Sequence, residues 1–297
     1  MMVQAGFEPS LCVSGAMRTD VGCVRSLNED AVAFIKPAAG SPENRFGALA
    51  LVADGMGGHA AGEVASVLAV EVVWRIFYSL EGAPPQTLRT ALETANRAIL
   101  DYAAAHPECS GMGTTCTVLG VRDNRLWLAH IGDSRAYLLR EGRLTQLSDD
   151  QTLHAQMVRE GAMSPEEAGV GPGSNVILQA LGTREEIEPT IWTEGLPLRK
   201  GDVAFLCSDG LSNLVDNQAI GKIIADSSPS EACRRLIEAA RAGGGDDNIS
   251  VGVFIVEDDD AAASEDQAAT KRIQVAEAFH GAATTKINTV GNSHDRL

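Results

Sequence analysis

The chain has 297 residues, of which 44% are hydrophobic and only 4% aromatic, so its core must consist mainly of aliphatic side chains. Its formal net charge of -16 argues against nucleic acid as a primary partner, because phosphate backbones attract basic surfaces. The same excess of acids fits a protein that gathers carboxylates to hold cations.

The six cysteines include no CxxC pair, which argues against a zinc ribbon. No basic region followed by an apolar run indicates a secretory signal, and no apolar run approaches membrane-spanning length. We therefore expect a cytoplasmic protein without a membrane partner. Nothing suggests an obligate dimer, so a monomer is expected.

Residues 1–17 are weakly patterned and are interpreted as a leader or a first edge strand. Residues 18–35 read as two short strands around a polar connection that holds Arg25 and the triplet Asn28-Glu29-Asp30. Adjacent acids are usually solvated surface, but here an apolar run follows them directly. A carboxylate at the mouth of a buried strand costs stability unless something pairs with it.

Residues 46–53 form an apolar run, predicted as a central strand, that ends on Asp54. Glycines then follow at 55, 57 and 58, and they would let the backbone approach a ligand closely. The alternative is an ordinary Asp-Gly turn. Helical patterns over 59–78 and after Pro84-Pro85 predict a layer of antiparallel helices over a sheet.

Three later strands carry an acid at one end in the same way. The strand at 125–131 leads to Gly132-Asp133, the strand at 202–207 leads to Asp209-Gly210, and Asp247 precedes the strand at 249–256. Each acid alone fits a turn or a helix cap. Their conjunction with Asp54 indicates a common site.

The other segments are less informative. Residues 162–175 are loop-like and are the best candidate for a mobile flap. The spacing of Ser228 and Glu231 predicts a capping box at the start of a helix. Residues 257–297 are acidic and rich in alanine, so we expect a flexible tail that does not join the core, with a weak helix over 270–279.

If the strands belong to one sheet system, four to six carboxylates can converge in one cleft, where only cations would relieve their repulsion. Oxygen ligands without a His or Cys cluster select Mg²⁺ or Mn²⁺. Two such ions would share a bridging carboxylate and lower the pKa of a bridging water, which would attack phosphorus in line. Arg25 could then hold the phosphate oxygens.

The order of these motifs resembles the metal-dependent protein phosphatase family, protein phosphatase type 2C, in its compact bacterial form. The matching segments cover residues 18–256 and are TDVG (19–22), Arg25, NED (28–30), VADGMGGH (52–59), GMGTT (111–115), GDSR (132–135), CSDGL (207–211) and DNIS (247–250).

The resemblance implies an α+β fold, a four-layer α-β-β-α sandwich of two antiparallel sheets flanked by helix pairs, with a catalytic domain at 18–256. It also implies hydrolysis of phosphoserine and phosphothreonine in proteins, in opposition to a cognate protein kinase. The phosphorylated proteins, including that kinase, would be its partners. Residues 162–175 fall where bacterial members carry a flap beside the active site.

By position, the resemblance makes Asp54 the ligand that bridges both metals and Arg25 the phosphate clamp. The remaining ligands that it implies are Glu29, the Gly55 carbonyl and, through water, Asp30 for the second metal, Asp209 and Asp247 for the first, and Asp133 with Asp209 for a third, weaker metal.

The sequence departs from the family at the proposed general acid. Many eukaryotic members place a histidine two residues after the bridging aspartate, whereas this chain has Met56, and His59 lies too far along to inherit the role. Our hypothesis is that metal-bound water supplies the proton of the leaving group. Two alternatives stay open: a catalytically silent scaffold that binds phosphoproteins, and a phosphatase for small phosphate esters.

Overall fold

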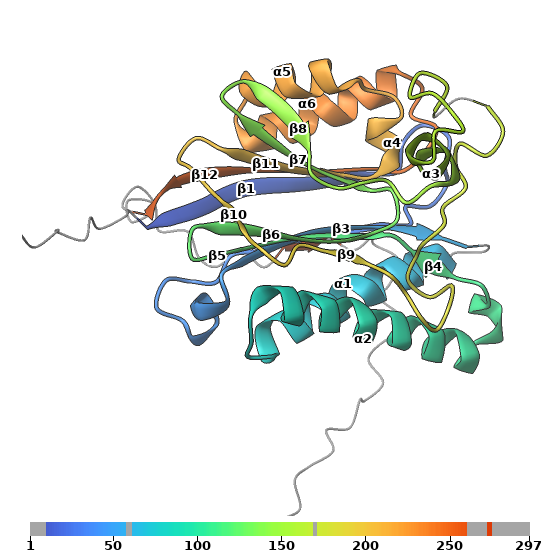
Figure 1. Cartoon of the computed structure of the whole chain (residues 1–297), viewed down its shortest axis with the longest axis horizontal. Helices are drawn as coiled ribbons and strands as arrows, with labels where there is room; N and C mark the ends of the chain where they lie inside the picture. Colours follow the sequence, from blue (N-terminus) through green and yellow to red (C-terminus); the bar gives the residue numbers. More distant parts are fainter. Residues whose placement is uncertain (1–9, 58–60, 169–170, 260–271, 275–297) are drawn as a thin grey trace, which may run out of the picture.

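Two antiparallel β-sheets pack face to face, and helices cover both outer sides (Figure 1). The computed structural model describes residues 10–57, 61–168, 171–259 and 272–274. The first sheet has the order β1 (Leu11–Asp20), β12 (Ile249–Asp258), β11 (Val203–Cys207), β7 (Arg135–Arg140) and β8 (Arg143–Gln146).

The second sheet has the order β10 (Leu196–Pro197), β6 (Arg125–Ile131), β5 (Cys116–Arg122), β3 (Ala48–Met56), β2 (Asp30–Ile35) and β13 (Arg272–Gln274). Two short strands extend it, since β4 (Gly113–Thr114) pairs with β3 and β9 (Thr190–Ile191) pairs with β6. The predicted position of the 46–53 strand inside a sheet is confirmed, because β3 lies between β5 and β2.

Helix pairs form the two outer layers. The helices α1 (Ala61–Ser79) and α2 (Pro84–Ala105) pack on the second sheet, and α5 (Asn217–Ala225) and α6 (Pro229–Ala242) pack on the first. Shorter pieces are α3 (Leu153–Arg159), α4 (Asp209–Ser212) and two 3₁₀ helices, Pro42–Phe46 and Pro107–Cys109. The predicted four-layer α-β-β-α sandwich is confirmed.

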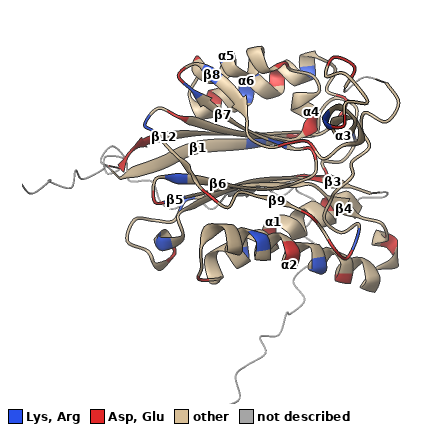
Figure 2. Cartoon of the chain, in the orientation of Figure 1, with Lys and Arg blue, Asp and Glu red and all other residues tan. Residues whose placement is uncertain are grey.

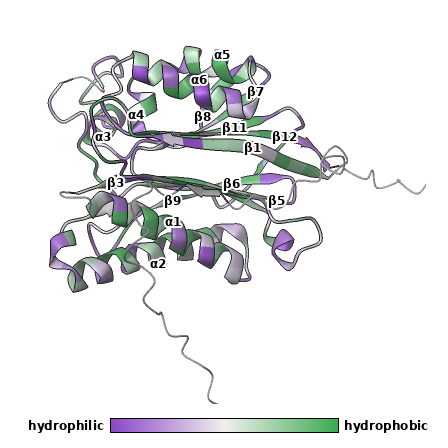
Figure 3. Ribbon diagram, turned by 180° about the vertical axis from the view of Figure 1, so that it is seen from behind, coloured by the Kyte–Doolittle hydropathy of each residue, from purple (hydrophilic) through white to green (hydrophobic). Residues whose placement is uncertain are grey.

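The alternation of side chains along β3 explains why an aspartate reaches the interior. Leu49 and Leu51 pack against the α1–α2 layer, whereas Ala50 and Val52 pack in the core between the sheets. Figure 3 shows hydrophobic colouring along the strands and on parts of the helices. Because successive side chains of a strand point to opposite faces, Asp54 continues the inner row of Ala50 and Val52.

The inner rows of neighbouring strands also become polar at this end of the sandwich. Asp30 lies in the same row as Val32 and is the direct partner of Asp54 in the β2–β3 register. From the facing sheet, the Ser208 hydroxyl donates to Asp30 Oδ2 at 2.9 Å, and Ser250 lies close by in β12. Figure 2 shows acidic segments at the same end, near α4.

The two chain ends differ in how they match their predictions: residues 11–17 lie in an edge strand, one of the two structures expected there, whereas part of the tail departs from its prediction. β1 begins at Leu11 and pairs with β12 at the sheet edge, while residues 1–9 lie outside the described residues. β12 continues to Asp258, so the sheet includes two residues that were expected in the tail.

Among the tail residues that are described, 272–274 form β13 on β2, so the expectation of a weak helix and of no contact with the body is wrong there. The open edge of β2 offers unpaired backbone groups, which favour an added strand. The rest of 260–297 is outside the described residues.

Three further local features bear on the predictions. Ser228 makes no side-chain cap bond at α6, so the predicted capping box is wrong; Glu231 pairs with Arg234 instead. α5 was not predicted, although Asp216 caps it by accepting from the Ala219 N–H. Within the described residues, no helix is long and apolar enough to cross a membrane.

Candidate metal centre

The backbone of Asp54 is held by the segment that leads from β4 into β5. Its N–H donates to Thr115 Oγ1 at 3.0 Å, and its carbonyl accepts from the Thr115 N–H and the Thr114 hydroxyl, each at 2.9 Å. The threonines therefore hold the strand end that carries the central carboxylate.

Gly55 lies where three backbone segments meet. Its N–H donates to the Glu29 carbonyl at 3.1 Å, and a Cβ on it would lie 2.1 Å from the Gly62 carbonyl oxygen. No side chain fits this space, which explains the glycine. Glu29 also accepts a hydrogen bond from the Gly62 N–H in the first turn of α1. The helix start therefore holds the Glu29 carboxylate beside the Asp54–Gly55 turn.

Asp209 and Asp247 enter from the first sheet. The charge of Asp209 raises the pKa of Asp54, because the two carboxyl groups lie close together. Asn213 Nδ2 donates to Asp209 Oδ2 at 3.1 Å. Arg25 Nη2 donates to Asp247 Oδ2 at 2.8 Å, and Arg25 Nη1 lies 4.0 Å from Glu29 Oε2.

Asp133 completes the group from the turn after β6. Gln151 holds this turn, because its Oε1 accepts from the Gly132 N–H at 2.9 Å and its own N–H donates to the Gly132 carbonyl at 2.8 Å. The next strand begins with Arg135, which makes a bidentate pair with Asp150. The structure thus brings all eight predicted site residues to one end of the sandwich.

The acids strongly perturb one another's pKa values. Burial raises the pKa of Asp54 well above its usual value, and the charges of Asp30, Asp209 and Asp133 add to this rise. Burial raises the pKa of Asp30 to about 7 and, with the charge of Asp209, that of Asp133 to about 7. These pKa values show that Asp54 lies at the centre of a crowded set of carboxylates.

Unpaired oxygen atoms test whether this site suits a cation. The Oδ1 atoms of Asp30, Asp133 and Asp209 are buried and have no hydrogen-bond partner. Buried polar atoms are normally paired, so these oxygens call for a ligand. As the side chains stand, no three acids, histidines or cysteines of the described residues are arranged tightly enough to hold an ion. Arg25 partly offsets the charge of the acids through its pair with Asp247, and the oxygen-only set suits Mg²⁺ or Mn²⁺.

Sequence reasoning missed two residues that build this site. Ser208 bonds Asp30 and also accepts from the Ser250 N–H at 2.9 Å. Asn248 is 4% exposed, and it donates to the Val21 and Leu27 carbonyls and accepts from the Glu29 N–H. Their positions beside Asp209 and Asp247 were the available signal, since both continue the inner rows of their strands.

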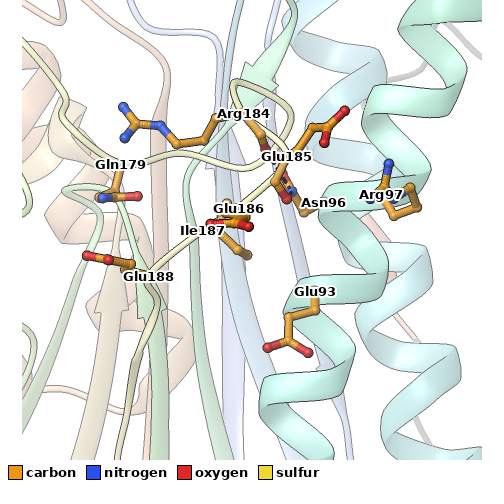
Figure 4. Close-up of a pocket in the computed structure, with 9 residues that line it drawn as sticks. All are labelled: Glu93, Asn96, Arg97, Gln179, Arg184, Glu185, Glu186, Ile187 and Glu188. Atoms are coloured by element: carbon orange, nitrogen blue, oxygen red, sulfur yellow. Dashed lines mark hydrogen bonds between the residues drawn. The ribbon is translucent and has the colours of Figure 1, made fainter.

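A cavity of about 810 Å³ lies elsewhere, between α2 and residues 179–188 (Figure 4). Its lining includes Glu93 and Arg97 from α2 and Arg184 and Glu188 from the facing segment, and none of the predicted site residues. The carboxylate cluster is therefore separate from this cavity. His59 and residues 169–170 of the expected flap lie outside the described residues.

Comparison with known proteins gives consistent results. A family model described as protein phosphatase 2C matches residues 24–241. The serine/threonine protein phosphatase PstP of Mycobacterium tuberculosis (strain ATCC 25618 / H37Rv) is 42% identical over 245 residues, which are 82% of this chain. The chain spans only 45% of the length of that relative. The serine/threonine phosphatase stp of Listeria monocytogenes (strain ATCC BAA-679 / EGD-e) is 36% identical over 79% of this chain and 92% of its own length.

A solved structure has the same fold. It is the catalytic domain of a serine/threonine protein phosphatase PstP in complex with two manganese ions, and it is 41% identical with a TM-score of 0.72. The match covers 84% of this chain and 100% of that one. The family model spans most of the chain and the Listeria relative matches over nearly its full length, so the chain belongs to the protein phosphatase 2C family.

Proposed function

We propose that the chain is a metal-dependent serine/threonine protein phosphatase that hydrolyses phosphoserine and phosphothreonine in proteins. The observation that carries the proposal is the crowded carboxylate cluster around Asp54, with its unpaired buried oxygens and Arg25 at its edge. The names of the relatives and the two manganese ions in the PstP structure support it.

The residues around Asp54 divide into sets for the cations. Asp54 would contact both of two tightly bound Mn²⁺ or Mg²⁺ ions. The other proposed ligands are Glu29, the Gly55 carbonyl and, through water, Asp30 for one ion, Asp209 and Asp247 for the other, and Asp133 with Asp209 for a third, weaker ion. Bound cations would act as Lewis acids and lower the pKa of water at the site.

The hydrolysis forms a bond between a water oxygen and phosphorus and breaks the bond between phosphorus and the serine or threonine oxygen. Arg25 is half-exposed, so its guanidinium can turn towards the phosphoryl oxygens and hold them bidentately. The carboxylates supply the negative charge that binds the cations. Ser208 positions Asp30 by a hydrogen bond, and Asn248 positions the backbone of Glu29.

The leaving alkoxide needs a proton, and Met56 has none to give. His130 is buried, bonds Thr117 and the Asp149 carbonyl, and has a pKa lowered by burial, so it does not serve as an acid at the cluster. We therefore assign the proton to water within the site.

The cellular context is proposed on chemical grounds. The partners would be phosphorylated proteins, including the kinase that the enzyme opposes, and its role would lie in signalling. We propose a monomer that works in the cytoplasm, where reversible protein phosphorylation supplies its substrates.

The test is hydrolysis of a phosphothreonine peptide by metal-stripped protein, with and without Mn²⁺, beside the variant Asp54→Ala. Phosphate release that requires both the metal and Asp54 supports the proposal. No release by folded protein under any divalent metal would favour a phosphoprotein-binding scaffold. Release from small esters only, without competition by the phosphopeptide, would favour a small-ester phosphatase.

A further inference from the structure

Exposed apolar side chains gather around the carboxylate cluster. Of the large hydrophobic residues in the described part of the chain, five are exposed: Val24 (68%), Leu27 (45%), Leu80 (39%), Leu153 (36%) and Val176 (46%). Isolated exposed apolar residues are normal on a protein surface. Four of these five, however, belong to two segments that adjoin the cluster, one around Arg25 and the other around Gln151.

The first segment is an arch, residues 21–28, that presents Arg25 between Val24 and Leu27. Asn248 Nδ2 holds both ends of the arch, donating to the Val21 carbonyl at 3.0 Å and to the Leu27 carbonyl at 2.9 Å. The Cys23 N–H donates to the Gly245 carbonyl at 2.7 Å. Val24 and Leu27 are therefore exposed on a fixed backbone, beside the side chain that would bind the phosphoryl group.

The second segment adjoins Asp133. Gln151, which is bonded to Gly132, is followed closely by Leu153 in the first turn of α3. The Leu153 N–H donates to the Val176 carbonyl at 2.9 Å, so these two exposed residues are held together. The Leu178 N–H also donates to the Gln151 carbonyl, at 2.8 Å, and anchors the far end of the loop.

We propose that Val24, Leu27, Leu153 and Val176 form an apolar rim that selects phosphoproteins with aliphatic residues next to the phosphorylated side chain. This inference rests on the proposed phosphatase function and adds a substrate class to it. An extended peptide advances about 3.3 Å per residue, so residues within two positions of the phosphorylated one would lie beside Val24 and Leu27, the neighbours of Arg25, while Arg25 holds the phosphoryl group.

The charge of the protein supports aliphatic rather than acidic flanks. The chain carries a formal net charge of -16, and acids of the cluster lie near both segments of the rim: Glu29 and Asp247 beside Arg25, and Asp133 next to Gly132, which is bonded to Gln151. Acidic residues beside the phosphorylated residue would meet the like net charge of the protein, whereas aliphatic residues would bury the exposed surface of the rim.

The test compares three phosphothreonine peptides of equal length with Mn²⁺-loaded enzyme. Two flanking residues on each side are Val and Leu in the first peptide, Ser and Gly in the second and Glu in the third. The double variant Val24→Ser/Leu27→Ser is compared with Leu80→Ser, a matched control in which the exposed apolar residue lies just beyond the far end of α1. That helix has 19 residues, which separates Leu80 from the cluster by about 28 Å.

We expect kcat/KM to be about tenfold higher for the Val/Leu peptide than for the Ser/Gly peptide, and lowest for the Glu peptide. The double variant Val24→Ser/Leu27→Ser should reduce the preference for the Val/Leu peptide over the Ser/Gly peptide to about twofold, mainly by raising KM for the Val/Leu peptide. Leu80→Ser should keep the tenfold preference. Equal kcat/KM for the Val/Leu and Ser/Gly peptides, or an unchanged preference in the rim variant, would overturn the rim but leave the phosphatase standing. No hydrolysis of any peptide or small ester would overturn both.

Discussion

Arg25 Nη2 lies 2.8 Å from Asp247 Oδ2, so the proposed phosphate clamp is bound to a proposed metal ligand. Arg25 Nη1 lies 4.0 Å from Glu29, another proposed ligand. Burial alone would lower the pKa of Arg25, but the charges of Asp247 and Glu29 raise it on balance. The same guanidinium thus offsets the charge of the acids and lies ready to meet a phosphoryl group.

Replacing this guanidinium should impair substrate binding. For Arg25→Ala we expect kcat/KM on a phosphopeptide to fall about 100-fold, or about 2.7 kcal/mol, because a charged bidentate contact to the phosphoryl group is lost. The matched control is Arg241→Ala, which breaks the 2.6 Å pair with Asp20. Steady-state kinetics should show near-normal values for the control, and a similar loss in both variants would contradict the clamp.

Two aspartates, one in the carboxylate cluster and one in a buried ion pair, should respond in opposite ways to the same change. Asp209→Asn removes one of several like charges, so the metal-free protein should unfold within about 0.5 kcal/mol of the original while activity falls at least about 1000-fold. Asp202 is 2% exposed and pairs with Arg140 at 2.6 Å, so Asp202→Asn should lower the free energy of unfolding by about 3 kcal/mol.

Denaturant unfolding in chelator and turnover with Mn²⁺ would be measured on both aspartate variants. Asp202→Asn should still need the metal and turn over at a near-normal rate below its unfolding temperature. Near-normal turnover by Asp209→Asn would refute its place in the metal centre.

The acids should also make the metal-free protein less stable as pH rises. Burial raises the pKa values of Asp30 and Asp133 from the ordinary value of 3.8 to about 7. Between these values the folded chain binds more protons than the unfolded chain, so the free energy of unfolding falls as pH rises from about 4 to about 7. The stabilisation is complete below pH 4 and is lost as pH passes about 7.

Denaturant unfolding in chelator at pH 5 and pH 8 checks this dependence. We expect a loss of at least about 1 kcal/mol at pH 8, which saturating Mn²⁺ should reverse because it binds only the folded state. Asp30→Asn/Asp133→Asn should flatten the change with pH. Equal or greater stability at pH 8 without metal would contradict the raised pKa values of Asp30 and Asp133 in the folded protein.

Local patterns predicted strands and helices, whereas the four-layer sandwich and the roles of the site residues followed from the resemblance of the motif order to a known family. Strand alternation fixes the inner row that ends in Asp54, and an Asp-Gly pair at strand ends is visible without a structure. The motif order then indicated which ends converge. The register that sets Asp30 opposite Asp54 is a tertiary property and could not be read from either segment alone.

Other features depended on contacts that no local pattern reports. Asn248 links three backbone groups of the 21–29 segment, about 220 residues away in the chain. Ser228 has the spacing of a capping residue, yet Glu231 pairs with Arg234 and the box does not form. β13 forms because the edge of β2 is open, which composition does not show.

The tail gives a last test, which depends on where the sheet ends. Ser14 donates to Glu257 at 2.7 Å and Lys200 pairs with Asp258, so a truncation before Glu257 removes sheet contacts, whereas one after Asp259 removes none of these. We expect the longer form, which ends at Asp259, to keep its turnover of a small ester and its unfolding midpoint, because β13 pairs over only three residues. The shorter form, which ends before Glu257, should lose about 1 kcal/mol of its free energy of unfolding, because hydrogen bonds and part of the β1–β12 pairing are lost. Thermal unfolding and ester hydrolysis of the two truncations would decide this, and a large loss of turnover in the longer form would mean that the tail supports the catalytic body.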